Sequence, residues 1–143
     1  MVDVEVSVLG GDVRQHVACM LLDVEAFPHR VVTFGQPGSA TVWIAEREGR
    51  VIGYLAAKVT AGVEVYVNAL TTAKEVRRSG AARALIAAAI RASEKLLAPL
   101  RLHVARSNLA AVKLYESEGF RVRSIRRGYY PGGVDAFEMV REV

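Results

Sequence analysis

The stretch Arg77-Arg78-Ser79-Gly80-Ala81-Ala82 lies between VEVYVNALTT (63–72), typical of a strand, and an alanine-rich segment typical of a helix. A strand that turns through a glycine into a helix presents several unpaired backbone N–H groups at one positive point. Gly80 has no Cβ to keep the backbone away from a ligand. Three arginines add charge: Arg77, Arg78 and Arg83. The stretch predicts an anion site, although arginines before a helix are also common at a solvated helix end.

A second strand-then-helix pattern follows, LRLHVAR (100–106) and then SNLAAVKLYESEGF (107–120). Asn108 stands where an N-cap residue is expected, and Gly119 stands just past the helix end. Asn108 and Tyr115 are two helical turns apart, so their side chains start near one face. We expect this face to suit a long ligand lying along the helix.

The two motifs together resemble the GNAT superfamily of acetyl-CoA-dependent N-acetyltransferases. The family's pyrophosphate turn, [QR]-x-x-G-x-[GA], is matched by Arg77, Gly80 and Ala82. Its N-x-x-A-x-x-[LF]-Y-x-x-x-G-F signature is matched by Asn108, Ala111, Leu114, Tyr115, Gly119 and Phe120. The resemblance covers residues 27–139 and implies an α/β fold, with a mixed, mostly antiparallel sheet of about seven strands flanked by helices. It also implies a single domain, 1–143, with acetyl-CoA as co-substrate and no metal.

Three shorter segments are similar to the protein N-terminal acetyltransferases, including the ribosomal-protein-alanine type and archaeal relatives. They are Ala26-Phe27-Pro28, Leu102-His103-Val104, and Tyr129-Tyr130-Pro131 with Asp135-Ala136 and Met139. The likeness implies that Phe27, Pro28, Tyr66, Tyr129 and Tyr130 contact the first residues of a protein or peptide substrate. It implies cofactor contacts at Leu70, Thr71, Thr72, Arg77, Arg78, Ser79, Gly80, Ala81, Ala82, Arg83, Asn108 and Tyr115.

The reaction that the resemblance implies is direct attack of a neutral amine on the thioester, without an acyl-enzyme. A protein α-amino group has a pKa of ~7.7–8.0 and a lysine amine of ~10.4, so near neutral pH roughly a tenth of the former is neutral and under a thousandth of the latter. A modest base therefore suffices for protein N-termini.

His103 is the candidate base, because its strand alternation puts it on a face with Arg101 and its ordinary pKa suits proton removal near neutrality. The alternative is a core histidine bonded to a carbonyl. In the alanine-specific branch a glutamate commonly stands here, whereas another branch has histidine. In that branch a tyrosine matching Tyr66 helps order a proton-carrying water; the alternative for Tyr66 is a buried aromatic that fills the sheet. Tyr115 is the family's candidate acid toward the CoA thiolate, either by proton transfer or by a hydrogen bond.

Composition sets limits on the other classes of function. The 143 residues are 52% hydrophobic, which is enough for one core, and no stretch has the length of a membrane span. The N-terminus lacks a basic region, so we expect no secretory signal and a cytoplasmic location. Cys19, the single cysteine, lies in an apolar helical pattern and is expected to be buried.

The net charge of +4 and the pI of about 9.5 raise the alternative of nucleic-acid binding. The arginines are dispersed, however, and one group of them is explained by the phosphates of CoA. The ribosome or a ribosomal protein is a further candidate partner. Two other functions also stay open: acetylation of lysine side chains or small amines, and a non-catalytic acyl-CoA-binding or nucleic-acid-binding module.

Turn signals and periodicity predict the remaining elements. Strands are expected at 2–9, 41–46, 51–60, 63–72, 100–106, 120–128 and 134–142. Helices are expected from Asp12, capped with the help of Gln15, to before Pro28, from Gly80 to 97, and at 108–118.

Overall fold

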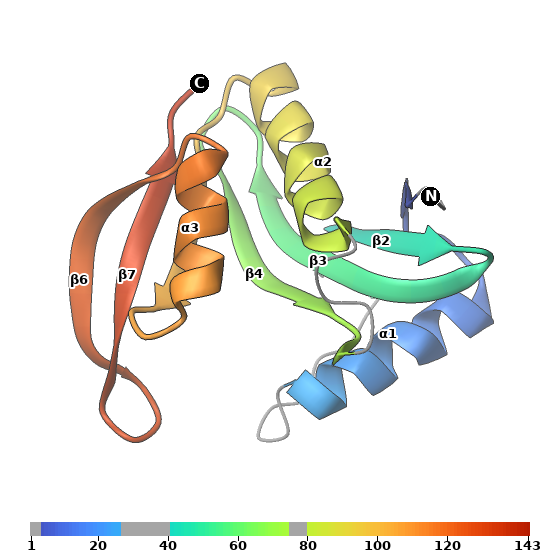
Figure 1. Ribbon diagram of the computed structural model, residues 1–143. Coiled ribbons are helices and arrows are strands. Elements are labelled where there is room, and N and C mark those ends of the chain that lie inside the picture. The colour runs from blue at the N-terminus through green and yellow to red at the C-terminus, as the bar shows by residue number, and fades with distance from the viewer. Residues whose placement is uncertain (1–3, 27–40, 75–79) are drawn as a thin grey trace. The chain divides into compact units, whose positions relative to one another are not determined.

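A computed structural model describes residues 4–26, 41–74 and 80–143 of the chain. The elements are β1 (Glu5–Val8), α1 (Val13–Ala26), β2 (Thr41–Arg47), β3 (Arg50–Thr60), β4 (Glu64–Thr72), α2 (Ala81–Lys95), β5 (Leu100–Ala105), α3 (Leu109–Ser117), β6 (Arg121–Tyr130) and β7 (Val134–Arg141). Each expected strand and helix is present within the described residues, with bounds shifted by a few residues (Figure 1).

The described strands form one mixed sheet in the order β1-β2-β3-β4-β5-β7-β6, flanked by helices. Strands β4 and β5 run parallel, whereas the pairs β1–β2, β2–β3, β5–β7 and β6–β7 are antiparallel. The β2–β3 hairpin turns at Glu48 and Gly49, and both residues have positive φ, as a tight turn between twisted strands requires. The predicted α/β fold with seven strands is confirmed.

The chain divides into two compact units. The first comprises 1–59 and 68–89, and the second comprises 60–67 and 90–143. Both β4 and α2 contribute residues to both units. The prediction of a single domain stays a prediction.

In the first unit, α1 begins where the sequence predicts. Of the two interactions in the predicted capping box, the one made by Asp12 is present and the one made by Gln15 is not. Asp12 accepts a hydrogen bond from the backbone N–H of Arg14 at 2.9 Å, which is the N-cap interaction. The Gln15 side chain does not complete a capping box with Asp12; its amide donates to the Glu46 carboxylate at 2.9 Å. This long-range bond competes with the local one, so Gln15 joins the helix to β2.

The core of the first unit forms around Cys19, which is fully buried as predicted. It packs with Val42 and Ile44 of β2, Tyr54 and Ala56 of β3, and Ala69 of β4. Tyr54 donates a hydrogen bond to the buried Asp23 of α1, which gives that carboxylate a hydrogen-bond partner. Cys19 and Asp23 are one turn apart, and they mark the face that α1 buries.

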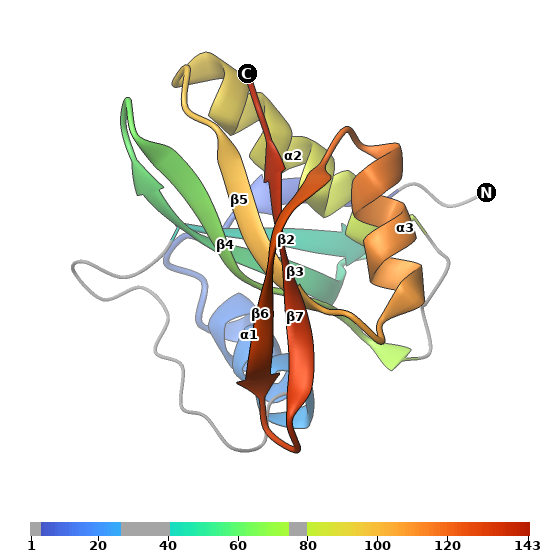
Figure 2. The same ribbon diagram turned by 90° about the vertical axis from the view of Figure 1, so that its left-hand side faces the viewer.

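In the second unit, β5 lies between β4 and β7, and β6 pairs with β7 in a long hairpin (Figure 2). Leu100, Leu102 and Val104 of β5 are buried, while the alternating Arg101 and His103 are partly exposed on the other face. Asn108 caps α3 by accepting a hydrogen bond from the Ala111 N–H at 3.2 Å, and Gly119 follows the helix with φ +93°. Both predicted helix ends are confirmed. None of the described helices is long and apolar enough to cross a membrane.

Candidate active site

Tyr66 of β4 and His103 of β5 meet on one face of the second unit. The parallel register sets Tyr66 beside Arg101, and His103 is the next residue on that face of β5. The Tyr66 hydroxyl lies 2.6 Å from His103 Nδ1, which is a short hydrogen bond whose direction depends on the histidine tautomer. The structure therefore brings together the two side chains expected to handle the amine proton.

Tyr129 and Tyr130, near the tip of the β6–β7 hairpin, lie against this pair. The Tyr129 ring stacks on the His103 ring with centroids 4.8 Å apart and an interplanar angle of 15°. Tyr130 packs edge-on against Tyr129 at 4.9 Å. The Arg101 guanidinium also contacts the pair and lies 4.4 Å from the centre of the Tyr66 ring. Four of the predicted residues thus form one aromatic cluster, and Tyr129 is about half exposed.

A carboxylate that sequence reasoning did not single out completes the cluster. Glu138 of β7 lies directly opposite His103 in the β5–β7 register, and its Oε2 is 3.7 Å from His103 Nε2. Arg101 contributes to the same site through ion pairs with Glu64 at 2.7 Å and with Glu138 at 3.4 Å. A lone acidic residue within the apolar run AFEMV (136–140) is a sequence signal that could have identified Glu138.

The surroundings shift the pKa values of the pair in opposite directions. Burial lowers the pKa of His103, the carboxylate of Glu138 opposes that shift, and Arg101, Arg126 and Arg123 add to it. Burial, followed by the neighbouring Tyr129, raises the pKa of Tyr66. At neutral pH the histidine is therefore neutral and the tyrosine is protonated, so the pair can accept a proton from a bound amine.

Tyr115 of α3 is buried and packs against Phe120 with ring centroids 5.6 Å apart. Burial, together with the nearby Tyr130, raises the pKa of Tyr115 to about 12. A thiol has a pKa of ~8.5, so moving the proton from this phenol to a thiolate is uphill by roughly 5 kcal/mol. The sequence left two roles open for Tyr115: proton transfer to the CoA thiolate, or a hydrogen bond to it. This environment favours the hydrogen bond.

In the first unit, Gly80 has φ +87° and precedes α2, and its carbonyl accepts the N–H of Ala84 at 2.9 Å. The first-turn N–H groups of residues 81–83 have no acceptor within the helix. A Cβ built on Gly80 would meet no atom of the described residues within 4 Å, so among them this turn leaves open space beside the backbone. The described half of the predicted phosphate turn thus has the backbone geometry that anion binding needs.

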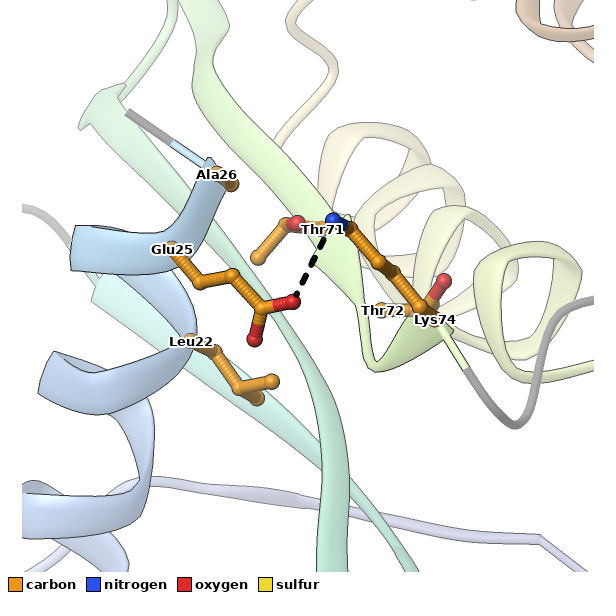
Figure 3. A pocket seen from close by; sticks show the side chains of 6 residues that line it. All are labelled: Leu22, Glu25, Ala26, Thr71, Thr72 and Lys74. Carbon is orange, nitrogen blue, oxygen red and sulfur yellow. Dashed lines mark ion pairs between the residues drawn. The ribbon is translucent and has the colours of Figure 1, made fainter. Parts of the chain in front are cut away.

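Thr71 and Thr72, at the end of β4, line a small hollow with Leu22, Glu25, Ala26 and Lys74 (Figure 3). Two of these lining residues, Glu25 and Lys74, form a 3.6 Å ion pair. Ala26 is the last residue of α1 and directly precedes the predicted Phe27-Pro28 wall. Leu70, the third residue expected to meet the pantetheine arm, precedes the two threonines on β4.

Five of the predicted site residues lie outside the described residues: Phe27, Pro28, Arg77, Arg78 and Ser79. Ala81, Ala82 and Arg83 form the first turn of α2, as expected. Among the described residues no group of three His, Cys, Asp or Glu side chains could hold a metal ion.

Comparisons with known proteins point to one family. Residues 14–120 match the sequence profile of the acetyltransferase (GNAT) family. The chain is 33% identical over 105 residues to the N-terminal acetyltransferase A complex catalytic subunit NAA10 of Arabidopsis thaliana, covering 68% of this chain and 55% of that protein. It is 48% identical over 58 residues to the ribosomal protein bS18-alanine N-acetyltransferase of Escherichia coli K12, covering 40% of this chain and 39% of that protein.

The fold agrees with a solved structure of the same Escherichia coli type. The crystal structure of the ribosomal-protein-S18-alanine N-acetyltransferase superposes with a TM-score of 0.82 at 28% identity, covering 96% of this chain and 93% of that chain. In sequence, the aligned region spans about half of the Arabidopsis relative and less than half of the bacterial one.

Proposed function

The chain belongs to the acetyltransferase (GNAT) family, and we propose that it transfers an acetyl group from acetyl-CoA to the N-terminal α-amino group of proteins. The observation that carries the proposal is the Tyr66–His103 hydrogen bond under the paired tyrosines of the β6–β7 hairpin. The narrower N-terminal class is supported by the two relatives, whose names state N-terminal or alanine N-acetylation.

The geometry supports separate tasks for the two members of the pair. His103 Nδ1 is occupied by the Tyr66 hydroxyl, and His103 Nε2 faces Glu138. Neither ring nitrogen is therefore directed at an incoming amine. The amine proton passes to the Tyr66 oxygen, by contact or through a water, while the Tyr66 proton moves to Nδ1. His103 is the final acceptor, and Tyr66 is the group that the substrate meets.

Substrate choice follows from the strength of this base. Burial lowers the pKa of His103, so it is a weaker base than an ordinary histidine. Near neutral pH roughly a tenth of an α-amino group is already neutral, against under a thousandth of a lysine side chain. A weak base can serve an α-amino group with little loss of rate, whereas a lysine side chain would need a stronger base.

The turn before α2 fits the phosphates of acetyl-CoA, because Gly80 leaves open space beside first-turn N–H groups that lack helical acceptors. Bound acetyl-CoA supplies the acetyl group as a thioester. Gly80, Ala81 and Ala82 would hold its diphosphate, with Arg77, Arg78, Ser79 and Arg83 adding positive charge and hydrogen-bond donors. Leu70, Thr71 and Thr72 would meet its pantetheine arm. Asn108 and Tyr115 would border it, and the Tyr115 hydroxyl would donate to the departing sulfur.

On the substrate side, Tyr129 and Tyr130 offer aromatic surface next to Tyr66, and we expect Phe27 and Pro28 to form a second apolar wall. Apolar walls favour a hydrophobic first residue, methionine among them. A cytoplasmic location is part of the proposal, and ribosomal proteins are candidate partners because the Escherichia coli relative is named for one.

An acetyl-transfer assay across peptides that differ only at their first residue tests the proposal. Met-first, Ala-first and Ser-first peptides, one series taken from ribosomal proteins, are compared with an N-blocked peptide that carries an internal lysine. We expect turnover of free N-termini, fastest for Met-first, and none of the blocked control. Comparable acetylation of the blocked peptide would replace the proposal with lysine acetylation.

A further inference from the structure

Glu138 has only 3% of its surface exposed, and the proposed function gives it no task. An ionised carboxylate is costly to bury unless charged and hydrogen-bonding partners surround it. Within the part of the chain that the structure describes, four side chains besides His103 do so: Arg101, Arg123, Ser124 and Arg126. These partners surround a carboxylate that lies directly opposite the candidate base, and this arrangement indicates a role for Glu138 at the site.

The two oxygens of Glu138 have different surroundings. Oε1 accepts from Arg123 Nε at 2.7 Å and from Ser124 Oγ at 3.3 Å. Oε2 lies 3.4 Å from Arg101, 3.6 Å from Arg126 and 3.7 Å from His103 Nε2. The hydrogen bond from Arg123 is the main cause that lowers the pKa of Glu138 to about 2, so the carboxylate stays ionised throughout the neutral range. One oxygen is thus held in place, and the other presents negative charge to the imidazole.

The sheet fixes this arrangement. His103 is the direct cross-strand partner of Glu138, so their side chains leave the same face. The β6–β7 register shifts between Val122 and Ser124, and Ser124 then pairs with Glu138. This irregularity lets both Arg123 and Ser124 reach the same carboxylate oxygen. The orientation of Glu138 therefore does not depend on a flexible loop.

An ionised carboxylate beside Nε2 favours a proton on that nitrogen, because a lone pair there would face negative charge. Nδ1 is then the acceptor of the imidazole and takes the Tyr66 O–H. We propose that Glu138 is a positioning residue, which holds His103 in the tautomer with hydrogen on Nε2 and stabilises the imidazolium formed when the Tyr66–His103 pair takes up the substrate's proton. The kinetic part of this inference rests on the proposed function.

The proton balance of the step is complete. The amine proton goes to the Tyr66 oxygen, the Tyr66 proton goes to Nδ1, and Nε2 keeps its hydrogen toward Glu138. No proton passes to the carboxylate, which remains the counter-ion of the imidazolium, as the aspartate does in a serine-protease triad.

Among the described residues, the groups that face His103 come from its own strand and from three others: Arg101 of β5, Tyr66 of β4, Glu138 of β7, and Arg123, Arg126 and Tyr129 of β6. Among them Glu138 favours the charged imidazole, whereas Arg101, Arg126 and Arg123 disfavour it. Removing the carboxylate must therefore lower the pKa of His103, and removing an arginine must raise it. The tautomer separates the two roles, because a purely structural role for Glu138 predicts no change of tautomer when its charge is removed.

Long-range proton–nitrogen NMR of the imidazole, assigned by comparison with His103→Ala, tests the tautomer and the pKa without any substrate. We expect hydrogen on Nε2 in the wild type. In Glu138→Gln we expect hydrogen on Nδ1, because the amide can donate to Nε2, together with a pKa lower by about one unit. An unchanged tautomer and an unchanged pKa in Glu138→Gln would overturn the proposal. Asp135→Asn is the matched control, since it removes another β7 carboxylate that pairs with an arginine, Arg127 at 3.5 Å, and should leave both readouts unchanged.

Arg126→Gln covers the case in which Glu138→Gln does not fold, because the Arg126 side chain is 58% exposed. Its His103 pKa should rise, opposite to the shift in Glu138→Gln, and a fall or no change would count against the proposal. In peptide assays Glu138→Gln should lower kcat about 10- to 100-fold, with the acid limb moved to lower pH and acetyl-CoA binding unchanged. If the NMR shifts occur but no peptide is acetylated, the N-terminal function fails and the positioning role stands.

Discussion

His103 is the residue on which the proposed chemistry depends most. His103→Ala should lower kcat by ~10²–10⁴, the usual contribution of a positioned base, while the Kd for acetyl-CoA stays the same. A base works when neutral, and His103 is neutral above its pKa, which burial holds below ~6.5. The rate should therefore rise with pH through a value below ~6.5 in the wild type. That step should vanish in the variant, leaving only ionisation of the amine.

Tyr66→Phe provides the comparison, since it removes the hydroxyl that bonds Nδ1 and leaves the ring. Its loss of kcat should be similar to that of His103→Ala, and the double variant should be little worse than either single one, because the two residues act as one unit. A less than fivefold loss in His103→Ala would mean that Tyr66 or solvent takes the proton without it.

A separate prediction concerns Tyr115 and the alkaline end of the pH–rate profile. Its pKa of about 12 means that the hydroxyl stays protonated where an ordinary tyrosine ionises. The rate should hold level up to about pH 10. Tyr115→Phe should lower kcat roughly 10- to 100-fold, as expected for a lost hydrogen bond to a charged group. A fall in rate between about pH 9 and 10 that Tyr115→Phe abolishes would show that the phenol ionises in that range.

The residue scale also shows what a sequence can reveal. Strand alternation placed Arg101 and His103 on one face, and the resemblance supplied Tyr66 as a partner. In the structure the Tyr66 hydroxyl lies 2.6 Å from His103 Nδ1. The same alternation could not supply Glu138, because it depends on the β5–β7 register between strands that are distant in the chain. The lone acidic residue in AFEMV (136–140) could mark Glu138 but not its partner, and the shift in β6 that brings Arg123 to Glu138 has no local signature.

At the scale of the elements, the turn into α2 allows a prediction about the affinity for acetyl-CoA. Gly80→Val should raise the acetyl-CoA Kd strongly, because a left-handed φ costs a side-chain-bearing residue ~1–2 kcal/mol and the added atoms fill the space beside the N–H groups. Calorimetry measures the Kd. Gly62→Val is the matched control, since Gly62 has φ +74° and open space too but lies in the β3–β4 turn. Equal affinity of the two variants for acetyl-CoA would remove the phosphate-turn assignment.

Helix α1 shows how element prediction succeeds and where it stops. Apolar residues at helical spacing predicted a helix, and α1 spans Val13–Ala26. Yet Val13, Val17, Met20 and Leu21 are all about half or more exposed, whereas Cys19 and Asp23 are buried. Periodicity identifies an apolar stripe, but the face that is buried depends on what packs there. The Tyr54 hydroxyl makes a buried aspartate acceptable, and that partner comes from a distant strand.

For the whole molecule, shared elements connect the two units. Residues 64–67 of β4 and 90–95 of α2 belong to the second unit, and the rest of both elements belongs to the first. Unfolding one unit alone would break a strand and a helix in their middles, where cooperativity is strong. We therefore expect one unfolding transition, in keeping with the single domain expected from the sequence.

Gly53→Ala tests this coupling from within the first unit. Its added Cβ would lie 2.9 Å from the Thr71 carbonyl oxygen and 3.1 Å from Thr72 Cγ2, so backbone must move, and we expect a loss of about 1–3 kcal/mol in the free energy of unfolding. Fluorescence of Trp43, the single tryptophan, reports the first unit, and hydrogen exchange at Leu102 and Met139 reports the second. In Gly53→Ala both readouts should show the same loss in the free energy of unfolding. In the control Gly11→Ala, whose added Cβ meets no described atom within 4 Å, neither readout should change by more than about 0.5 kcal/mol. A lower Trp43 midpoint with unchanged exchange at β5 and β7 would instead mean two independently folding domains. Since β4 and α2 run through both units, a strain at Gly53 should reach the strands that hold Tyr66, His103 and Glu138.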